Sequence, residues 1–164
     1  MPFIPTVIRW YDSAANGLAH LECLPLLLAR LTLGAVFIPS GWGKLNNLDK
    51  VVGFFTELGI PAPQFQAPLA AGSEFLFGIT VLLGLFTRIS AIPLAVIMVV
   101  AMATAKHDEL VNSVGALAKI DTLVGFTEFL YLVLLIWLVV RGGGLLSLDR
   151  VLLRLRGGSS KPKV

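Results

Sequence analysis

The sequence predicts an all-α membrane protein in which four transmembrane helices form a bundle, with both chain termini in the cytoplasm. Apolar residue types make up 56% of its 164 residues and charged types only 14%, against roughly 25% charged residues in soluble domains. Four apolar segments of about 17–20 residues match the ~20 helical residues that cross a bilayer core. These segments are apolar on all sides, whereas a helix of a soluble bundle carries one apolar stripe. A soluble bundle of four helices is therefore the less favoured alternative.

The four predicted spans cover residues 24–43, 68–86, 89–106 and 122–140. With their links they form one transmembrane domain over residues 24–141. Pro25 suits the first turn of the first span, and Pro39 is expected to kink its far end. Only a short link around Thr87 and Arg88 joins the second and third spans, so we expect these two to be antiparallel neighbours.

The connection between the first two spans contains a further predicted helix. In LDKVVGFFTEL at 48–58 the apolar residues recur at helical spacing, which is typical of an amphipathic helix lying on a membrane surface. Gly59 and Pro61 follow it as end signals. A plain solvated loop is the alternative.

The two ends of the chain are predicted to lie at the membrane interface. Residues 1–23 form an N-terminal interfacial segment, in which Arg9 and Trp10 suit the headgroup level. Residues 142–164 form a basic tail, in which Ser147 can N-cap an amphipathic stretch. The arginines of this stretch are expected to lie against anionic lipid of the cytoplasmic leaflet. They are Arg150, Arg154 and Arg156.

The distribution of Lys and Arg predicts the orientation of the chain. If the four spans alternate in direction, eight of these residues fall on the side of the termini and four on the other side, while Arg30 lies inside the first span. Because the positive-inside rule counts Lys and Arg near the spans, both termini are expected in the cytoplasm. The formal net charge of +3 is too small to favour a nucleic-acid partner.

One carboxylate lies inside an apolar run. Glu74 is six residues beyond Pro68, or about 9 Å into the second span from its outer end. Glu128 is six residues into the fourth span, which starts on the same side, so the two carboxylates are expected at similar depth. Lys44 and His107 close the first and third spans on that side. All four spans thus bring an ionisable group to one outer layer.

These groups are the candidate polar pocket of the outer leaflet: Lys44, Glu74, His107 and Glu128, with Arg30 if its side chain extends outward. Ionisable residues within spans usually line a pathway or bind a ligand. We therefore expect either a ligand or proton site or, as the alternative, a structural ion pair between Glu74 and one of Lys44, Arg30 and His107. No catalytic residue is assigned, and no metal site is predicted, because the acids and His107 lack the spacing of a metal motif.

The sequence predicts no tightly bound redox centre. The two histidines, His20 and His107, fall on opposite sides of the membrane, so they do not form a bis-histidine haem site. The single cysteine, Cys23, excludes an iron–sulfur cluster held within the chain and an internal disulfide.

An ordered set of short motifs resembles the DoxX family over about residues 24–150. The motifs are RLTLG at 30–34, SGWGKL at 40–45, GIP at 59–61, LGLFTR at 83–88 and LSLD at 146–149, together with Glu74, Gly78, His107 and Glu128. After the fourth span the chain has Arg-Gly-Gly-Gly where the family often has Gly-Pro-Gly. This departure affects a turn and leaves the charged layer intact.

The resemblance implies a multi-pass protein of the bacterial inner membrane. The family takes its name from a subunit associated with a terminal quinol oxidase, and relatives are linked to thiosulfate:quinone oxidoreduction. The resemblance further implies an accessory subunit of a quinone-linked or other membrane redox assembly, with a quinone as candidate ligand. The implied partners are lipid, other membrane subunits or further copies of the chain. Two alternatives stay open: a structural subunit that packs partner helices, and an oligomeric carrier or channel for a small solute.

Overall fold

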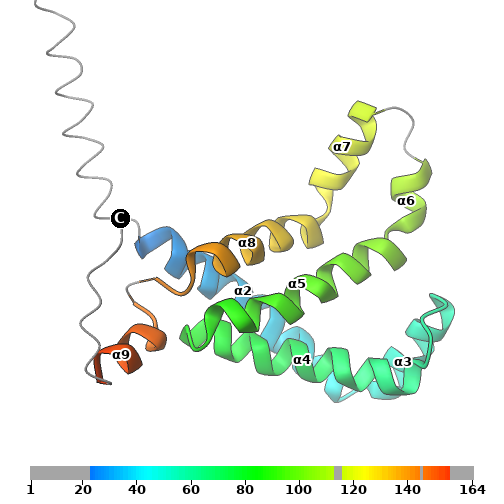
Figure 1. The fold of residues 1–164 in the computed structure, drawn as a ribbon. Helices are drawn as coiled ribbons and strands as arrows, with labels where there is room; N and C mark the ends of the chain where they lie inside the picture. Colours follow the sequence, from blue (N-terminus) through cyan, green and yellow to red (C-terminus); the bar gives the residue numbers. More distant parts are fainter. Residues whose placement is uncertain (1–22, 113–115, 145, 156–164) are drawn as a thin grey trace, which may run out of the picture.

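The computed structural model describes residues 23–112, 116–144 and 146–155. Every regular element in these ranges is a helix (Figure 1), so the predicted all-α class is confirmed. The helices are α2 (Cys23–Leu45), α3 (Leu48–Glu57), α4 (Pro63–Leu83), α5 (Thr87–Thr104), α6 (His107–Asn112), α7 (Ala116–Gly125), α8 (Thr127–Arg141) and α9 (Leu148–Leu155).

Some predicted features lie outside the described residues. Arg9 and Trp10 belong to this group, with nearly all of the predicted N-terminal segment, and so does Arg156 of the tail. Arg154 lies in α9, but its side chain is not among those described.

Three helices, α2, α4 and α5, are long and apolar enough to cross a membrane. The last predicted span, over 122–140, needs correction, because α7 and α8 meet at a break where the chain bends by 76°. Together they make a fourth span only if this bent pair counts as one. Gly125 ends α7 and has low helix propensity, and Phe126 between the helices takes an extended backbone conformation.

The middle two spans begin earlier than predicted. α4 starts at Pro63 and keeps Pro68 in its interior. Pro63 is tolerated because the first turn of a helix has no intrahelical partner for the missing N–H. α5 starts at Thr87, where the backbone N–H is held by the carboxylate of Asp149 from far along the chain.

The predicted amphipathic helix between the first two spans is α3, so the alternative of a plain loop is wrong. Gly59 follows it with a φ of +69°. The Gly59 N–H donates to the Thr56 carbonyl and the Ile60 N–H to the Phe55 carbonyl. This is the Schellman pattern, which satisfies carbonyls at a helix end and favours glycine at the left-handed position.

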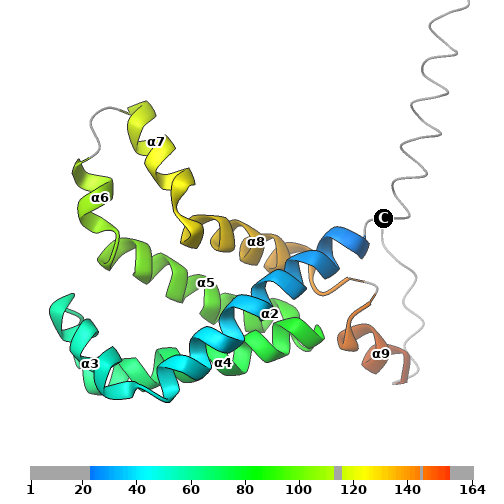
Figure 2. The same cartoon turned by 180° about the vertical axis from the view of Figure 1, so that it is seen from behind.

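The spans pack as two pairs that are joined by one tight turn. α2 packs along α4, α5 packs along α8, and the turn at 84–86 connects α4 to α5. The pairs lie close together near this turn and spread apart toward α3 and α6 (Figures 1 and 2). We call the end with the turn and α9 the closed end, and the end with α3, α6 and α7 the open end.

Glycines bring α2 and α4 into close contact. A Cβ at Gly41 would overlap the backbone nitrogen of Phe75, and one at Gly34 would lie 2.8 Å from the Leu82 side chain. From the other helix, a Cβ at Gly78 would lie 3.0 Å from Cβ of Phe37. Small residues at such positions let helix backbones approach closely, which is how helices gain packing energy inside a bilayer.

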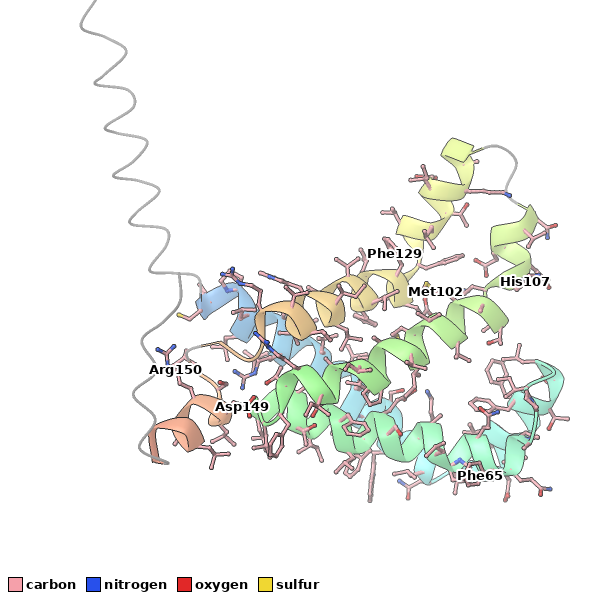
Figure 3. All side chains as sticks on the ribbon, in the orientation of Figure 1. Phe65, Met102, His107, Phe129, Asp149 and Arg150 are labelled. Atoms are coloured by element: carbon pink, nitrogen blue, oxygen red, sulfur yellow. The ribbon has the colours of Figure 1, made fainter. Side chains whose placement is uncertain are left out.

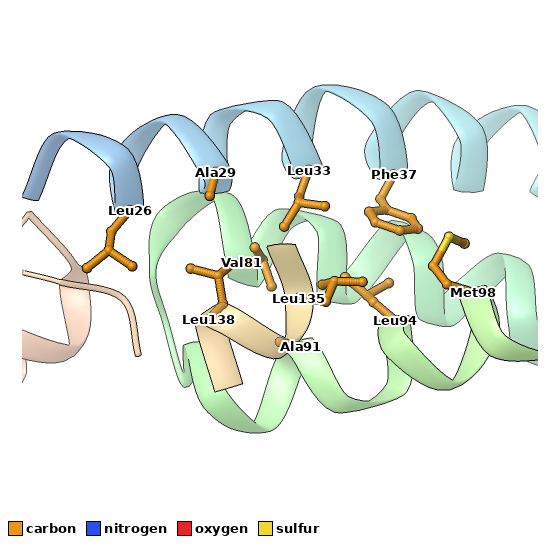
Figure 4. Packing of buried hydrophobic residues seen from close by; sticks show 10 residues of the cluster. All are labelled: Leu26, Ala29, Leu33, Phe37, Val81, Ala91, Leu94, Met98, Leu135 and Leu138. Carbon is orange, nitrogen blue, oxygen red and sulfur yellow. The ribbon is translucent and has the colours of Figure 1, made fainter. Parts of the chain in front are cut away.

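The core contains side chains from all four long helices (Figure 4). Its members are Leu26, Ala29, Leu33, Phe37, Val81, Ala91, Leu94, Met98, Leu135 and Leu138. Many outward-facing side chains on the same helices are also large and apolar, for example Leu28, Leu76, Ile92 and Val140. Helices that are apolar inside and outside are typical of proteins surrounded by lipid.

Candidate functional site

The carboxylate of Glu74 is buried in the α2–α4 contact. Its residue is only 1% exposed. The ammonium of Lys44 lies 2.5 Å from Oε1 of Glu74, and the hydroxyl of Ser40 donates a 2.9 Å hydrogen bond to Oε2. Both donors come from α2 and are four residues apart, so they lie on one face of that helix. We call Ser40, Lys44 and Glu74 the Glu74 cluster.

The Glu74 cluster is reachable from one side. Side-chain exposure is 37% for Lys44 and 2% for Glu74, so the ammonium connects a buried acid to the surroundings. The close approach of the helices at Gly41 lets the Lys44 and Ser40 side chains reach across to α4. Removing one partner of a buried ion pair costs about 3–5 kcal/mol, although the pair itself adds little net stability.

Arg30 binds the backbone at the closed end. The residue is 2% exposed. Its Nε donates to the carbonyl of Val81 (3.0 Å) and its Nη2 to that of Leu82 (2.8 Å), at the last turn of α4. Its Nη1 donates to the carbonyls of Gly143 and Leu146, both at 3.0 Å. One guanidinium thus satisfies carbonyls at a helix end and in the segment that follows α8.

This position separates Arg30 from Glu74. Leu82 is eight residues from Glu74 along α4, which is about 12 Å of helix. The expected inclusion of Arg30 in a pocket with Glu74 is therefore not what the structure shows. Of the three bases considered for Glu74, Lys44 is the one that pairs with it.

Asp149 holds the same end from a distant point in the sequence. Its Oδ1 accepts the N–H of Phe86 (2.6 Å), and its Oδ2 accepts the N–H and the hydroxyl of Thr87 (3.1 and 3.3 Å). Its own N–H donates to the carbonyl of Gly84 (3.0 Å). Sequence reasoning assigned Asp149 no such role. The LSLD motif at 146–149 was the available signal.

Ser147 occupies the position before α9, as predicted for its N-cap. Its carbonyl accepts the N–H groups of Arg150 and Val151. The hydroxyl, however, donates to the carbonyl of Gly144 (2.8 Å). This contact tightens the turn after α8, while Asp149 caps the neighbouring helix.

A second polar site lies at the break between α7 and α8. An open pocket of about 370 Å³ is lined by side chains that include Lys106, Glu109, Thr122, Phe126, Thr127 and Glu128. The Lys106 ammonium lies 3.1 Å from the Glu109 carboxylate and 5.5 Å from the centre of the Phe126 ring. We call this the Glu128 pocket. Figure 3 labels Met102 on α5 and Phe129 on α8, close to the break where α7 meets α8.

The outer charged layer expected from the sequence is therefore divided. Lys44 and Glu74 lie together in the α2–α4 pair, whereas Glu128 lines a pocket with Lys106 in the α5–α8 half. His107 starts α6 and is exposed at the open end (Figure 3). Among the residues that the structure describes, no three His, Cys, Asp or Glu side chains gather as metal ligands.

These features define a class: a small helical protein with several membrane spans and a buried ion pair between two of them. Comparison with known proteins identifies the family. The sequence profile named DoxX matches residues 25–107, and the chain belongs to the DoxX family.

Similar proteins come from several bacteria. The chain is 37% identical to "Uncharacterized membrane protein Rv3486" of Mycobacterium tuberculosis, over 81% of this chain and 85% of that protein. It is 30% identical to "Inner membrane protein YqjF" of Escherichia coli, over 80% and 95%. It is 31% identical to "Putative oxidoreductase CatD" of Bacillus subtilis, over 75% and 83%. No solved structure matches the chain.

Proposed function

We propose that this protein is an accessory subunit of a quinone-linked or other redox assembly of the bacterial inner membrane, with both termini in the cytoplasm. The observation that carries the proposal is the Glu74 cluster, a buried acid in a membrane-crossing helix that is held by a partly exposed ammonium. Such residues usually mark a path or a binding site. Two relatives support the setting, since one is named "Inner membrane protein YqjF" and another "Putative oxidoreductase CatD".

The donors of the Glu74 cluster fit the oxygen of a quinone ring. An ammonium has three N–H donors, and one of those on Lys44 reaches Glu74. The exposed part of Lys44 leaves donors for a quinone oxygen approaching from the bilayer. Beside the cluster, the rings of Trp42 and Phe75 pack at a tilt of 39° with centroids 5.5 Å apart, and the half-exposed Trp42 ring offers an apolar face.

The chemistry assigned to this chain is binding and proton exchange. Reduction of a quinone adds two electrons and two protons. The electrons would come from a redox centre of a partner subunit. Lys44 would give one proton to the bound oxygen and regain it from water at its exposed side, while Glu74 holds the ammonium in place. The second proton would reach the other quinone oxygen from water. This chain would thereby hold and protonate a substrate whose electrons arrive from elsewhere.

Gentle detergent extraction from native membranes tests the accessory role. We expect the chain to elute in size-exclusion chromatography with a larger species whose absorption spectrum shows haem or flavin bands. A colourless species of 17.6 kDa plus detergent would contradict an accessory role. That result would favour an independent carrier, to be examined by solute flux in reconstituted vesicles.

The variant Glu74→Gln tests the site within the assembly. We expect quinone-linked turnover to fall, by up to the roughly 10²-fold that a positioned proton donor contributes, because the neutral amide no longer holds the Lys44 ammonium in place. The same partners should still co-elute. The matched control is Glu57→Gln, which neutralises an exposed acid of α3. Unchanged turnover in Glu74→Gln would reject the Glu74 cluster as a working site.

A structural subunit is the second candidate. In the described part of the chain, every buried side-chain nitrogen or oxygen has a hydrogen-bond partner, as expected for a pair that only pins two helices. The double variant Lys44→Met with Glu74→Leu separates the two functions. Retained turnover together with retained assembly would favour the structural role, and loss of turnover in an intact assembly would favour the quinone site.

A further inference from the structure

The Glu128 pocket contains groups of both charge signs at the end of a membrane-crossing helix. We propose that it binds a zwitterionic headgroup of the phosphoethanolamine type, with Lys106 contacting the anionic oxygens and Glu128 the ammonium. This site is separate from the Glu74 cluster and does not depend on the redox function proposed above.

Lys106 is positioned to receive an anionic group. Glu109 accepts one of its N–H groups at 3.1 Å, and the ring of Phe126 lies 5.5 Å from its nitrogen. These two contacts orient the ammonium without using all three of its donors. A third of the side chain stays exposed, so phosphate oxygens can reach it from the pocket.

Glu128 supplies the opposite charge. It lies in the first turn of α8 and is partly buried in the pocket wall. Within the described ranges no salt bridge holds its carboxylate, whereas Glu109 is already bonded to Lys106. A ligand ammonium would give Glu128 a charge-assisted hydrogen bond of the stronger kind.

The mixed lining selects among headgroups. A purely anionic group would face the carboxylates of Glu109 and Glu128, which is an unfavourable like-charge contact. A purely cationic group could pair with Glu128 but would make no favourable contact with the exposed part of Lys106. A zwitterion can oppose each charge with its complement. An ammonium can also donate to both carboxylates, which a trimethylated nitrogen of the choline type cannot do.

The size and place of the pocket fit a headgroup. Its volume of about 370 Å³ is near the lower limit of small-molecule pockets, about 300–1,000 Å³, which suits a headgroup better than a whole lipid. It adjoins the end of α5, an 18-residue candidate span, and lipid headgroups lie where spans end. The same chemistry is carried by a free zwitterion such as phosphoethanolamine.

Binding can be measured by isothermal titration calorimetry on the full chain in detergent. The probes are short-chain phosphatidylethanolamine, phosphatidylglycerol and phosphatidylcholine, with free phosphoethanolamine as a fourth. We expect saturable binding of phosphatidylethanolamine at least about tenfold tighter than that of the other two lipids. Free phosphoethanolamine binding as tightly as the lipid would identify a soluble ligand, and much weaker binding would identify the lipid. Equal binding of all three lipids would overturn the proposal.

Variants locate the binding. Glu128→Gln and Lys106→Gln should each weaken phosphatidylethanolamine binding about tenfold or more, since each removes a charge-assisted hydrogen bond. The matched controls Glu57→Gln and Lys50→Gln, on the exposed side of α3, should change it less than twofold. If Lys106→Gln does not fold, Glu128→Gln and its control Glu57→Gln still test the proposal. Unchanged phosphatidylethanolamine binding by Glu128→Gln would reject the site.

Discussion

Arg30 and Lys106 are cations at opposite ends of the molecule that are held in different ways. Arg30 is almost fully buried and binds four backbone carbonyls from α4 and from the segment after α8. Lys106 is a third exposed and contacts a carboxylate and a ring. A helix carbonyl cannot leave its partner without local unfolding, whereas side chains can change rotamer. The closed end is therefore built for stability, and the open end can rearrange around a ligand.

The largest expected effect follows from Arg30→Ala. This change removes the guanidinium from four carbonyls, of which that of Val81 keeps the N–H of Gly84. Because the other three lose a charged donor at a largely buried position, the free energy of unfolding should fall by about 3–5 kcal/mol. Unfolding in mixed detergent and SDS micelles measures the loss. The control Arg88→Ala removes an exposed arginine nearby and should cost less than about 0.5 kcal/mol. Equal losses in the two variants would contradict the assigned role of the closed end.

The next effect concerns the α2–α4 contact that positions the Glu74 cluster. Gly41→Ala should destabilise by about 1–3 kcal/mol, because the added Cβ overlaps the backbone of Phe75 and pushes the helices apart. Gly43→Ala is a matched control on the same helix, since a Cβ there meets no atom within 4 Å. It should be neutral or stabilise by up to about 1 kcal/mol. Equal effects of the two substitutions in the same unfolding assay would contradict the close contact of α2 and α4 at Gly41.

A smaller effect is expected from Asp149→Asn. The amide keeps one acceptor oxygen, so we expect a loss of about 1–2 kcal/mol. Hydrogen exchange should rise at the amides of Phe86 and Thr87, which the carboxylate caps, while the middle of α5 stays protected. Asp121→Asn, at an exposed position of α7, should leave exchange at those two amides unchanged. If hydrogen exchange at these two amides is unchanged in Asp149→Asn, the carboxylate does not cap α5.

The smallest effect is expected at the open end. Lys106→Ala should alter stability by no more than about 0.5 kcal/mol, because its ion pair with Glu109 is exposed and such pairs contribute little. Lys119→Ala, an exposed lysine of α7, is the control. If Lys106→Ala lowers the free energy of unfolding as much as Arg30→Ala does, the two ends do not differ in their contribution to stability.

Part of the site could be predicted from the sequence because depth in a membrane follows from position along a span. Counting residues from the ends of the spans placed Glu74 at the level of Lys44, His107 and Glu128, and left Lys44, Arg30 and His107 as its candidate partners. The structure pairs Glu74 with Lys44, and it places Glu128 in the other helix pair. Depth is a local quantity, whereas lateral neighbours depend on which helices pair. Here α2 pairs with α4 and α5 with α8.

The sequence by itself determined the all-α class, the three long apolar helices and the surface helix α3, because apolar length and helical spacing are local properties of the chain. Only the tertiary structure decided three features: the break at Phe126, the start of α5 at Thr87, and which carbonyls the Arg30 guanidinium binds. The start of α5 and the position of Arg30 depend on contacts between segments far apart in sequence, whereas the break is a bend between two helices that apolar length did not reveal. The buried guanidinium had several acceptors within reach of its span, and the packing of α4 and the LSLD segment around it selected among them.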